Sequence, residues 1–251
     1  MPPSPPPPPP SPPLYQVIDD LNRQWRDGQP SDELSKAGVM FAMVDGDEAP
    51  HAQWERPSWK RDRMSVSISN ARHPDVYWHM FTPGFVVNES AITSSISCAY
   101  AEDAGSIYVG NYGCRFPSGG SSPWGMGTHY AYPAGQIKDM LRTQDRLRAR
   151  GPTRCAQPGH RHCEAKEFGY NEIVVQNRGA HQWNDLLPGV IRAVVIQGNA
   201  ALHGTKGALA AQMHAAFLQR YGLSASNIPL LQYDWWAEDG KPFTLWDGHY
   251  S

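Results

Sequence analysis

Apolar side chains recur at helical spacing in three segments of the chain. In residues 14–27 they are Leu14, Val17, Ile18, Leu21 and Trp25, and Gly28 follows them. This spacing places the apolar side chains on one helix face, and a glycine is a common residue just past a helix end. Similar patterns predict helices over residues 133–150, with Pro133 in the first turn, and over residues 207–221. A short fourth helix is expected around residues 183–187, before Pro188.

Short apolar or alternating runs predict strands between these helices. The expected strands are residues 38–44, 64–69, 85–87, 92–100, 172–176, 191–197 and 228–233. Residues 64–69 alternate strictly between polar and apolar, which is typical of a strand with one buried face. Because helices and strands follow no regular βαβ rhythm, we expect the α+β class. The expected domain has a mixed, mainly antiparallel sheet and three to four helices.

Proline divides the chain of 251 residues into two unlike parts. Ten of the 23 prolines lie within residues 1–13, where the sequence is MPPSPPPPPPSPP. Proline fixes φ and lacks an N–H group, so we expect this tract to be disordered or a polyproline II rod. Residues 14–251 are expected to form a single globular domain. The tract resembles the hydroxyproline-rich stalks of extensin-like wall proteins, and a plain spacer or an SH3-type ligand is the alternative.

Charge and hydropathy exclude some functional classes. The net charge is −2, which gives no general attraction to nucleic acid, and no apolar run approaches the length of a transmembrane helix. Residues 138–166 carry eight Lys and Arg against three Asp and Glu. A basic helix followed by a basic loop suits sulfated glycans or phosphates, or else forms a solvated face. The candidate residues for binding an anion or a glycan are Arg142, Arg146, Arg150 and Arg154.

Four cysteines and one sequon bear on the compartment. Cys98, Cys114, Cys155 and Cys163 allow three disulfide pairings, of which Cys98–Cys114 with Cys155–Cys163 closes the shortest loops. Asn88-Glu-Ser is an acceptor sequence for N-glycosylation. Together with the tract they favour an extracellular or cell-wall location, with the cytoplasm as the alternative. No leader pattern precedes the tract, so this location requires a segment upstream of the given chain.

Two further patterns suggest metal sites, and we expect neither to be one. The loop from Cys155 to Cys163 also contains His160 and His162, which are zinc-type ligands, but their spacing is unlike that of usual structural sites. Asp45 and Asp47 follow an apolar strand, as in DxD-type glycosyltransferases, where carboxylates hold a divalent cation. A solvated turn explains the two aspartates equally well.

Three residues in sequence order resemble the R-S-E class of mono-ADP-ribosyltransferases. Arg72 follows a predicted strand, Ser94 lies in Thr93-Ser-Ser, and Glu172 begins a later strand. The resemblance implies that Arg72 and Ser94 hold NAD while Glu172 stabilises the developing oxocarbenium ion. The alternative is that Ser94 faces a neighbouring strand and Glu172 lies in a polar turn.

Several phrases resemble an uncharacterised group of secreted, cysteine-containing proteins of green algae and other protists. The resemblance spans residues 36–233 and rests on Ser97-Cys-Ala-Tyr, Gln136 to Leu141, Tyr170-Asn-Glu-Ile-Val-Val, Tyr221-Gly-Leu and Ile228-Pro-Leu-Leu. It implies a compartment and no reaction. Our first hypothesis is therefore an extracellular domain on a stalk, able to bind wall or sulfated glycans without a cofactor. A transferase that uses NAD is the alternative, and a DxD-type glycosyltransferase fragment is a further one.

Overall fold

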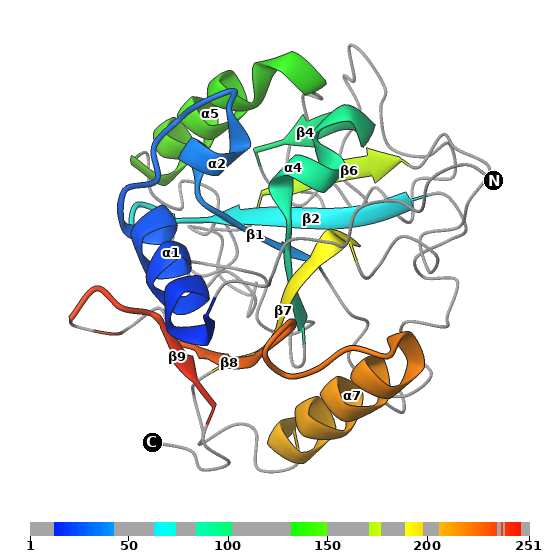
Figure 1. Ribbon diagram of the computed structural model, residues 1–251. Helices are drawn as coiled ribbons and strands as arrows, with labels where there is room; N and C mark the ends of the chain where they lie inside the picture. The colour runs from blue at the N-terminus through cyan, green and yellow to red at the C-terminus, as the bar shows by residue number, and fades with distance from the viewer. Residues whose placement is uncertain are drawn as a thin grey trace, which may run out of the picture.

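The computed structural model describes nine parts of the chain (Figure 1). They are residues 13–42, 63–73, 84–101, 132–149, 171–176, 189–197, 206–234, 237 and 239–246. The helices are α1 (Leu14–Arg26), α2 (Leu34–Ala37), α4 (Glu89–Ile92), α5 (Ile137–Ala149) and α7 (Lys206–Tyr221), with 3₁₀ turns η1 (Thr93–Ser95) and η2 (Ala134–Gln136). The strands are β1 (Val39–Ala42), β2 (Arg63–Ser69), β3 (Gly84–Val87), β4 (Ile96–Tyr100), β5 (Tyr132–Pro133), β6 (Glu172–Gln176), β7 (Ile191–Gln197), β8 (Leu230–Tyr233) and β9 (Phe243–Leu245).

One sheet of nine strands runs through these residues in the order β5-β4-β6-β2-β1-β3-β7-β8-β9. Every neighbouring pair is antiparallel except β7 and β8, which are parallel and flank α7 in the sequence. The predicted α+β class and mainly antiparallel sheet are therefore confirmed. Five α-helices occur among the described residues, against the three to four expected. The periodicity did not indicate α2 and α4, which are single turns.

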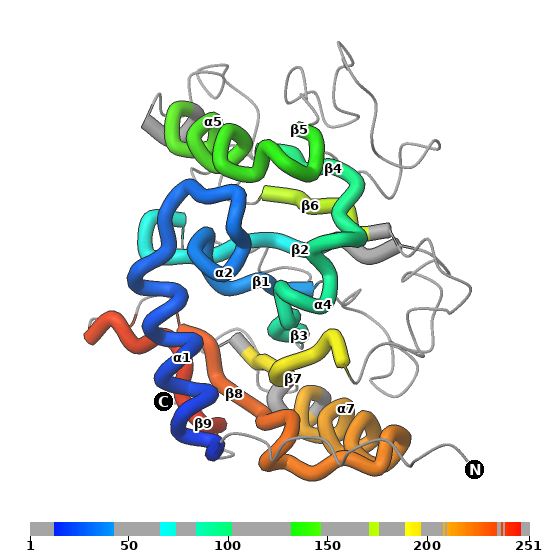
Figure 2. Tube along the Cα trace, turned by 45° about the horizontal axis from the view of Figure 1, so that its top comes forward, coloured from blue at the N-terminus to red at the C-terminus, as the bar shows by residue number. Residues whose placement is uncertain are grey.

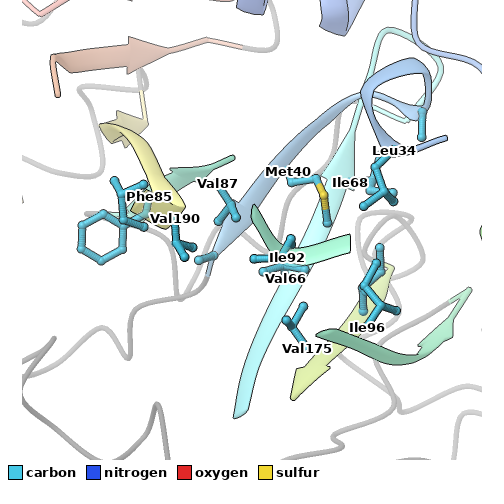
Figure 3. Packing of buried hydrophobic residues seen from close by; sticks show 14 of the residues in the cluster. Leu34, Met40, Val66, Ile68, Phe85, Val87, Ile92, Ile96, Val175 and Val190 are labelled. Carbon is cyan, nitrogen blue, oxygen red and sulfur yellow. The ribbon is translucent and has the colours of Figure 1, made fainter. Parts of the chain in front are cut away.

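Four helices cover one face of the sheet. Ile137, Met140 and Leu141 of α5 are fully buried there, and so are Met213 and Phe217 of α7. Figure 3 shows this core around Met40, Val66 and Ile68, with Ile92 of α4 packed against the strands. Figure 2 shows α5 beside β4 and β5, and α7 beside β7 and β8.

Helix α1 covers part of the opposite face. Its side chains Val17, Leu21 and Trp25 pack on apolar residues of β1, β3, β7, β8 and β9. These residues are Val39, Phe41, Val86, Ala193, Val195, Leu231, Tyr233 and Phe243. The indole of Trp25 donates to the hydroxyl oxygens of Ser69 and Tyr233, over 3.3 and 3.1 Å. α1 extends over Leu14–Arg26, so the predicted helix is confirmed.

The predicted strand over residues 92–100 is wrong in its first part. Asn88 caps α4, η1 follows, and β4 begins only at Ile96. The side chain of Asn88 accepts from the backbone N–H of Ser90, which satisfies a helix-start donor that a strand would leave to a neighbour. The capping residue therefore outweighs the β-propensity of the following residues.

Strand β2 corrects a second expectation, that one of its faces meets solvent. Ser67 and Ser69, on the polar side of the alternation, are both fully buried. Ser69 is buried because α1 and β8 bring Trp25 and Tyr233 onto it.

Among the described residues no helix is long and apolar enough to cross a membrane. The predicted helix around residues 183–187 lies outside the described residues.

Candidate functional site

The exposed side of α5 carries the predicted anion-binding residues that the structure describes. Arg142 and Arg146 are exposed and one helical turn apart, so they lie on the same side of the helix. The helix start is held by Asp32, whose carboxylate accepts from the backbone N–H of Lys138 over 2.9 Å. Arg150 and Arg154 lie outside the described residues.

One of the two acidic side chains of α5 turns away from Arg142 and Arg146 of the helix. Asp145 is 2.7 Å from Nε2 of the buried His73, on the turn after β2. Asp139 approaches Arg142 only to 3.8 Å, with both side chains more than half exposed. Exposed pairs of this kind bind weakly. One of the two acids of α5 therefore turns toward the protein and the other neutralises its partner poorly.

Arg146 is positioned by neutral groups. Its guanidinium donates to Oγ1 of Thr143 over 2.7 Å, and the hydroxyl of Tyr132 on β5 donates to the same oxygen over 2.7 Å. Within the described residues no carboxylate pairs with Arg146. The guanidinium is held in place while its positive charge faces solvent.

Large exposed apolar side chains are absent from this part of α5. In the described part of the chain the large hydrophobic side chains that are exposed are Tyr15 at 70% and Leu245 at 51%, on α1 and β9. Trp25 is buried and Trp246 is partly buried. The described face of α5 therefore presents charged side chains and no exposed aromatic ring.

The three residues predicted for a transferase do not come together. Ile96 pairs with Val175 and Tyr100 pairs with Glu172, so Glu172 lies at the far end of β4 from Ser94. Four residues of strand span about 13 Å, and Ser94 precedes the first of them. Arg72 follows the C-terminal end of β2, which lies at the same end of the sheet as Glu172. Arg72 and Ser94 are exposed, whereas Glu172 is 2% exposed.

Glu172 has buried polar neighbours that the sequence did not indicate. Tyr100 faces it across the β4–β6 ladder, and the β2–β6 register continues to Ser67 on its other side. The hydroxyl of Ser67 is buried and makes no hydrogen bond to the residues that the structure describes. Just before β6, the amide nitrogen of Asn171 donates to Oε1 of Gln144 on α5 over 3.1 Å. Only the spacing of polar residues in β2 was visible in the sequence, and it did not show that they are buried.

The predicted glycosylation site lies at the start of α4. The amide oxygen of Asn88 accepts from the N–H and the hydroxyl of Ser90, over 3.3 and 2.8 Å. Nδ2 of Asn88 donates to the carbonyl of Gly189 at a long 3.4 Å. The capping contacts use the oxygen alone, and a glycosylated Nδ2 keeps one hydrogen. The native cap is therefore compatible with a glycan on Asn88.

Cys98 is fully buried in β4 and is not a free thiol. Cys114, Cys155 and Cys163 lie outside the described residues, so the predicted disulfide pairing stays a prediction. Asp45, Asp47, His160 and His162 also lie outside them. In the ranges that the structure describes, no group of three or more His, Cys, Asp or Glu could hold a metal ion.

Comparison with known proteins identifies no relative. No protein-family model matches the chain, and neither a curated protein nor a solved structure matches it significantly. The resemblances to algal secreted proteins and to extensin-like stalks therefore stay predictions.

Proposed function

We propose that this protein is an extracellular binding domain on a proline-rich stalk, and that the exposed face of α5 binds anionic, sulfated glycans. The observation that carries the proposal is that carboxylates of the described residues neutralise Arg142 and Arg146 of α5 poorly. Asp145 is turned to His73, whereas Arg142 and Arg146 face solvent side by side. Guanidinium groups bind sulfate and carboxylate oxygens through paired hydrogen bonds, which suits polyanionic glycans.

Binding is favoured over the NAD transferase because of the strand register. A transferase of the R-S-E kind needs Arg72, Ser94 and Glu172 around one nicotinamide. By the strand register, Arg72 and Glu172 lie at one end of the sheet and Ser94 lies at the other. The arginine pair, by contrast, needs no residue from elsewhere in the chain.

The test measures binding to a sulfated polysaccharide by calorimetry at two salt concentrations. The double variant Arg142→Gln, Arg146→Gln is expected to bind at least about tenfold more weakly than the wild type. The wild-type affinity is expected to fall as salt rises, because exposed charges are screened.

A matched control is available on α1. Arg23 and Arg26 are also exposed, but they pair with Asp20 and Asp27. The double variant Arg23→Gln, Arg26→Gln is expected to keep wild-type affinity. Equal losses in both double variants would reduce the effect to net charge and reject the α5 site. Absence of binding by the wild type would reject the proposed function.

A further inference from the structure

Asn22 is a buried polar residue on the core-facing side of α1. It is 6% exposed, and its neighbours on that side are Val17, Leu21 and Trp25. Its amide nitrogen donates to the carbonyl of Phe243 over 2.9 Å, and its amide oxygen accepts from the N–H of Phe243 over 2.9 Å. One side chain thus takes both backbone groups of one residue of β9.

These backbone groups of Phe243 point away from the sheet. On either side of it, Asp234 N–H donates to Pro242 O over 2.8 Å, and Trp246 N–H donates to Leu230 O over 3.2 Å. In an antiparallel ladder, alternate residues of an edge strand bond to the neighbouring strand and the others face outward. Phe243 and Leu245 therefore present their N–H and C=O groups to the outer edge, where Asn22 occupies those of Phe243.

β9 is one end of the sheet as described, and β5 is the other. An unprotected edge strand pairs readily with a strand of another chain. β5 has only two residues, and one of them is Pro133, which has no N–H to offer. β9 has no proline or charged residue, and its Leu245 is 51% exposed. Asn22 supplies the protection that the sequence of β9 lacks.

We propose that Asn22 is an edge plug, which prevents β9 from pairing with β9 of a second copy of this chain. Two copies of the same edge strand can pair antiparallel about a twofold axis, so the partner needs no other complementary surface. Such a ladder requires the outward groups of Phe243, because Leu245 is the only other outward-facing residue of this three-residue strand. Asn22 therefore closes the edge by occupying one residue.

The test measures mass against concentration by light scattering and stability by urea unfolding. Asn22→Ala is expected to self-associate at a concentration at least about tenfold lower than the wild type. Adding Thr244→Lys, at an exposed position of β9, is expected to reverse the association because edge lysines oppose strand pairing. The stability lost with Asn22 is not expected to return in this double variant.

Asn171→Ala is the matched control. Asn171 also bonds to both backbone groups of one residue, Ile68, but in the sheet interior. It is expected to lose stability without gaining self-association. The proposal is overturned if Asn22→Ala associates no more than Asn171→Ala, or if Thr244→Lys does not reverse the association. If Asn22→Ala does not fold, Asn22→Asp, which keeps the acceptor for Phe243 N–H, is compared with Asn171→Asp by the same criteria.

Discussion

Two asparagine side chains take the place of a strand partner. Asn22 does so for Phe243 at the sheet edge, and Asn171 does so for Ile68, with both bonds to Ile68 at 2.8 Å. A carboxamide has one donor and one acceptor side by side, as a backbone residue of a ladder does. The main chain at both strand ends is therefore satisfied without a further strand.

Replacing Asn171 should cost more stability than replacing an exposed asparagine. Asn171→Ala leaves the N–H and C=O of buried Ile68 without their partner and also removes the bond to Gln144. We expect the free energy of unfolding to fall by about 2 to 4 kcal/mol. Urea unfolding measures it, with Asn227→Ala in an exposed turn as the control. Equal effects of the two substitutions would contradict the role given to Asn171.

Position 38 requires a glycine, both for its backbone angle and for the lack of space around it. Its φ is +144°, and a Cβ built there would lie 2.4 Å from the carbonyl oxygen of Ser69 on β2. Neither the conformation nor the space admits a side chain, and the close neighbour is main chain that cannot move aside.

Gly38→Ala is therefore expected to lower the free energy of unfolding by at least about 2 kcal/mol. Gly135→Ala is the matched control, because a Cβ there meets nothing within 4 Å. The control is expected to stay within about 0.5 kcal/mol of the wild type. A tolerated Gly38→Ala, measured by thermal or urea unfolding, would refute the close approach of β1 and β2 at this point.

At the scale of the element, periodicity located the long helices and most strands. The ranges predicted for α1, β3, β6 and β7 agree with the structure to within one residue, because each has a strong apolar pattern. The one-turn helices α2 and α4 and the short strands β5 and β9 were missed. Elements of two to four residues contain too few positions to show a period, and neighbouring elements stabilise them instead.

Helix α7 is tied to the segment just before β8 by a histidine. A ring nitrogen of His214 lies 2.6 Å from the carbonyl oxygen of Ile228. Burial lowers the pKa of His214 from its ordinary 6.5, and the carbonyl only partly opposes this. The unfolded chain therefore binds this proton more readily than the folded chain does.

The contribution of His214 to stability should thus be lost as the pH falls. It is fully present above pH 6.5 and decreases as the pH falls below that value, toward the lowered pKa of the folded state. His214→Gln keeps a donor for the Ile228 carbonyl and removes the titration. Urea unfolding between pH 7.5 and about pH 5 should show a smaller loss of stability in this variant than in the wild type. Parallel pH profiles would show that His214 titrates alike in both states.

In the whole molecule, the fold decides which charged side chains face solvent and which are paired. Counting residues suggested a basic segment from residue 138 onward, but α5 itself carries both signs. Packing against the turn after β2 draws Asp145 to His73 and leaves Arg142 and Arg146 facing outward. The proposed anion-binding face therefore results from the position of α5 on the sheet as much as from composition.

The proposed location is tested on the natural protein. Mass spectrometry of non-reduced protein is expected to find paired cysteines, a glycan on Asn88 and hydroxylated prolines in the tract of residues 1–13. Oxidised thiols and N-glycans both arise in the secretory route, so they should occur together. Free thiols, bare Asn88 and unmodified prolines in the same sample would reject an extracellular location.

The candidate site could be predicted only in part. Arg142 and Arg146 were identified because clustered charge is visible in one dimension. The triad of Arg72, Ser94 and Glu172 matched in order, but order along a chain does not determine which end of a strand a residue occupies. That depends on register, which pairs Tyr100 rather than the start of β4 with Glu172.

The sequence alone predicts the α+β class, the long helices and the buried strands, because local periodicity depends on neighbouring residues only. It also determined the proline tract and the supply of basic side chains. Long-range packing sets the strand order, the burial of Ser67 and Ser69, the pairing of Asp145 with His73 and the bonds of Asn22 at the β9 edge. Each of these joins residues far apart in the chain, and such contacts form only when the whole core assembles.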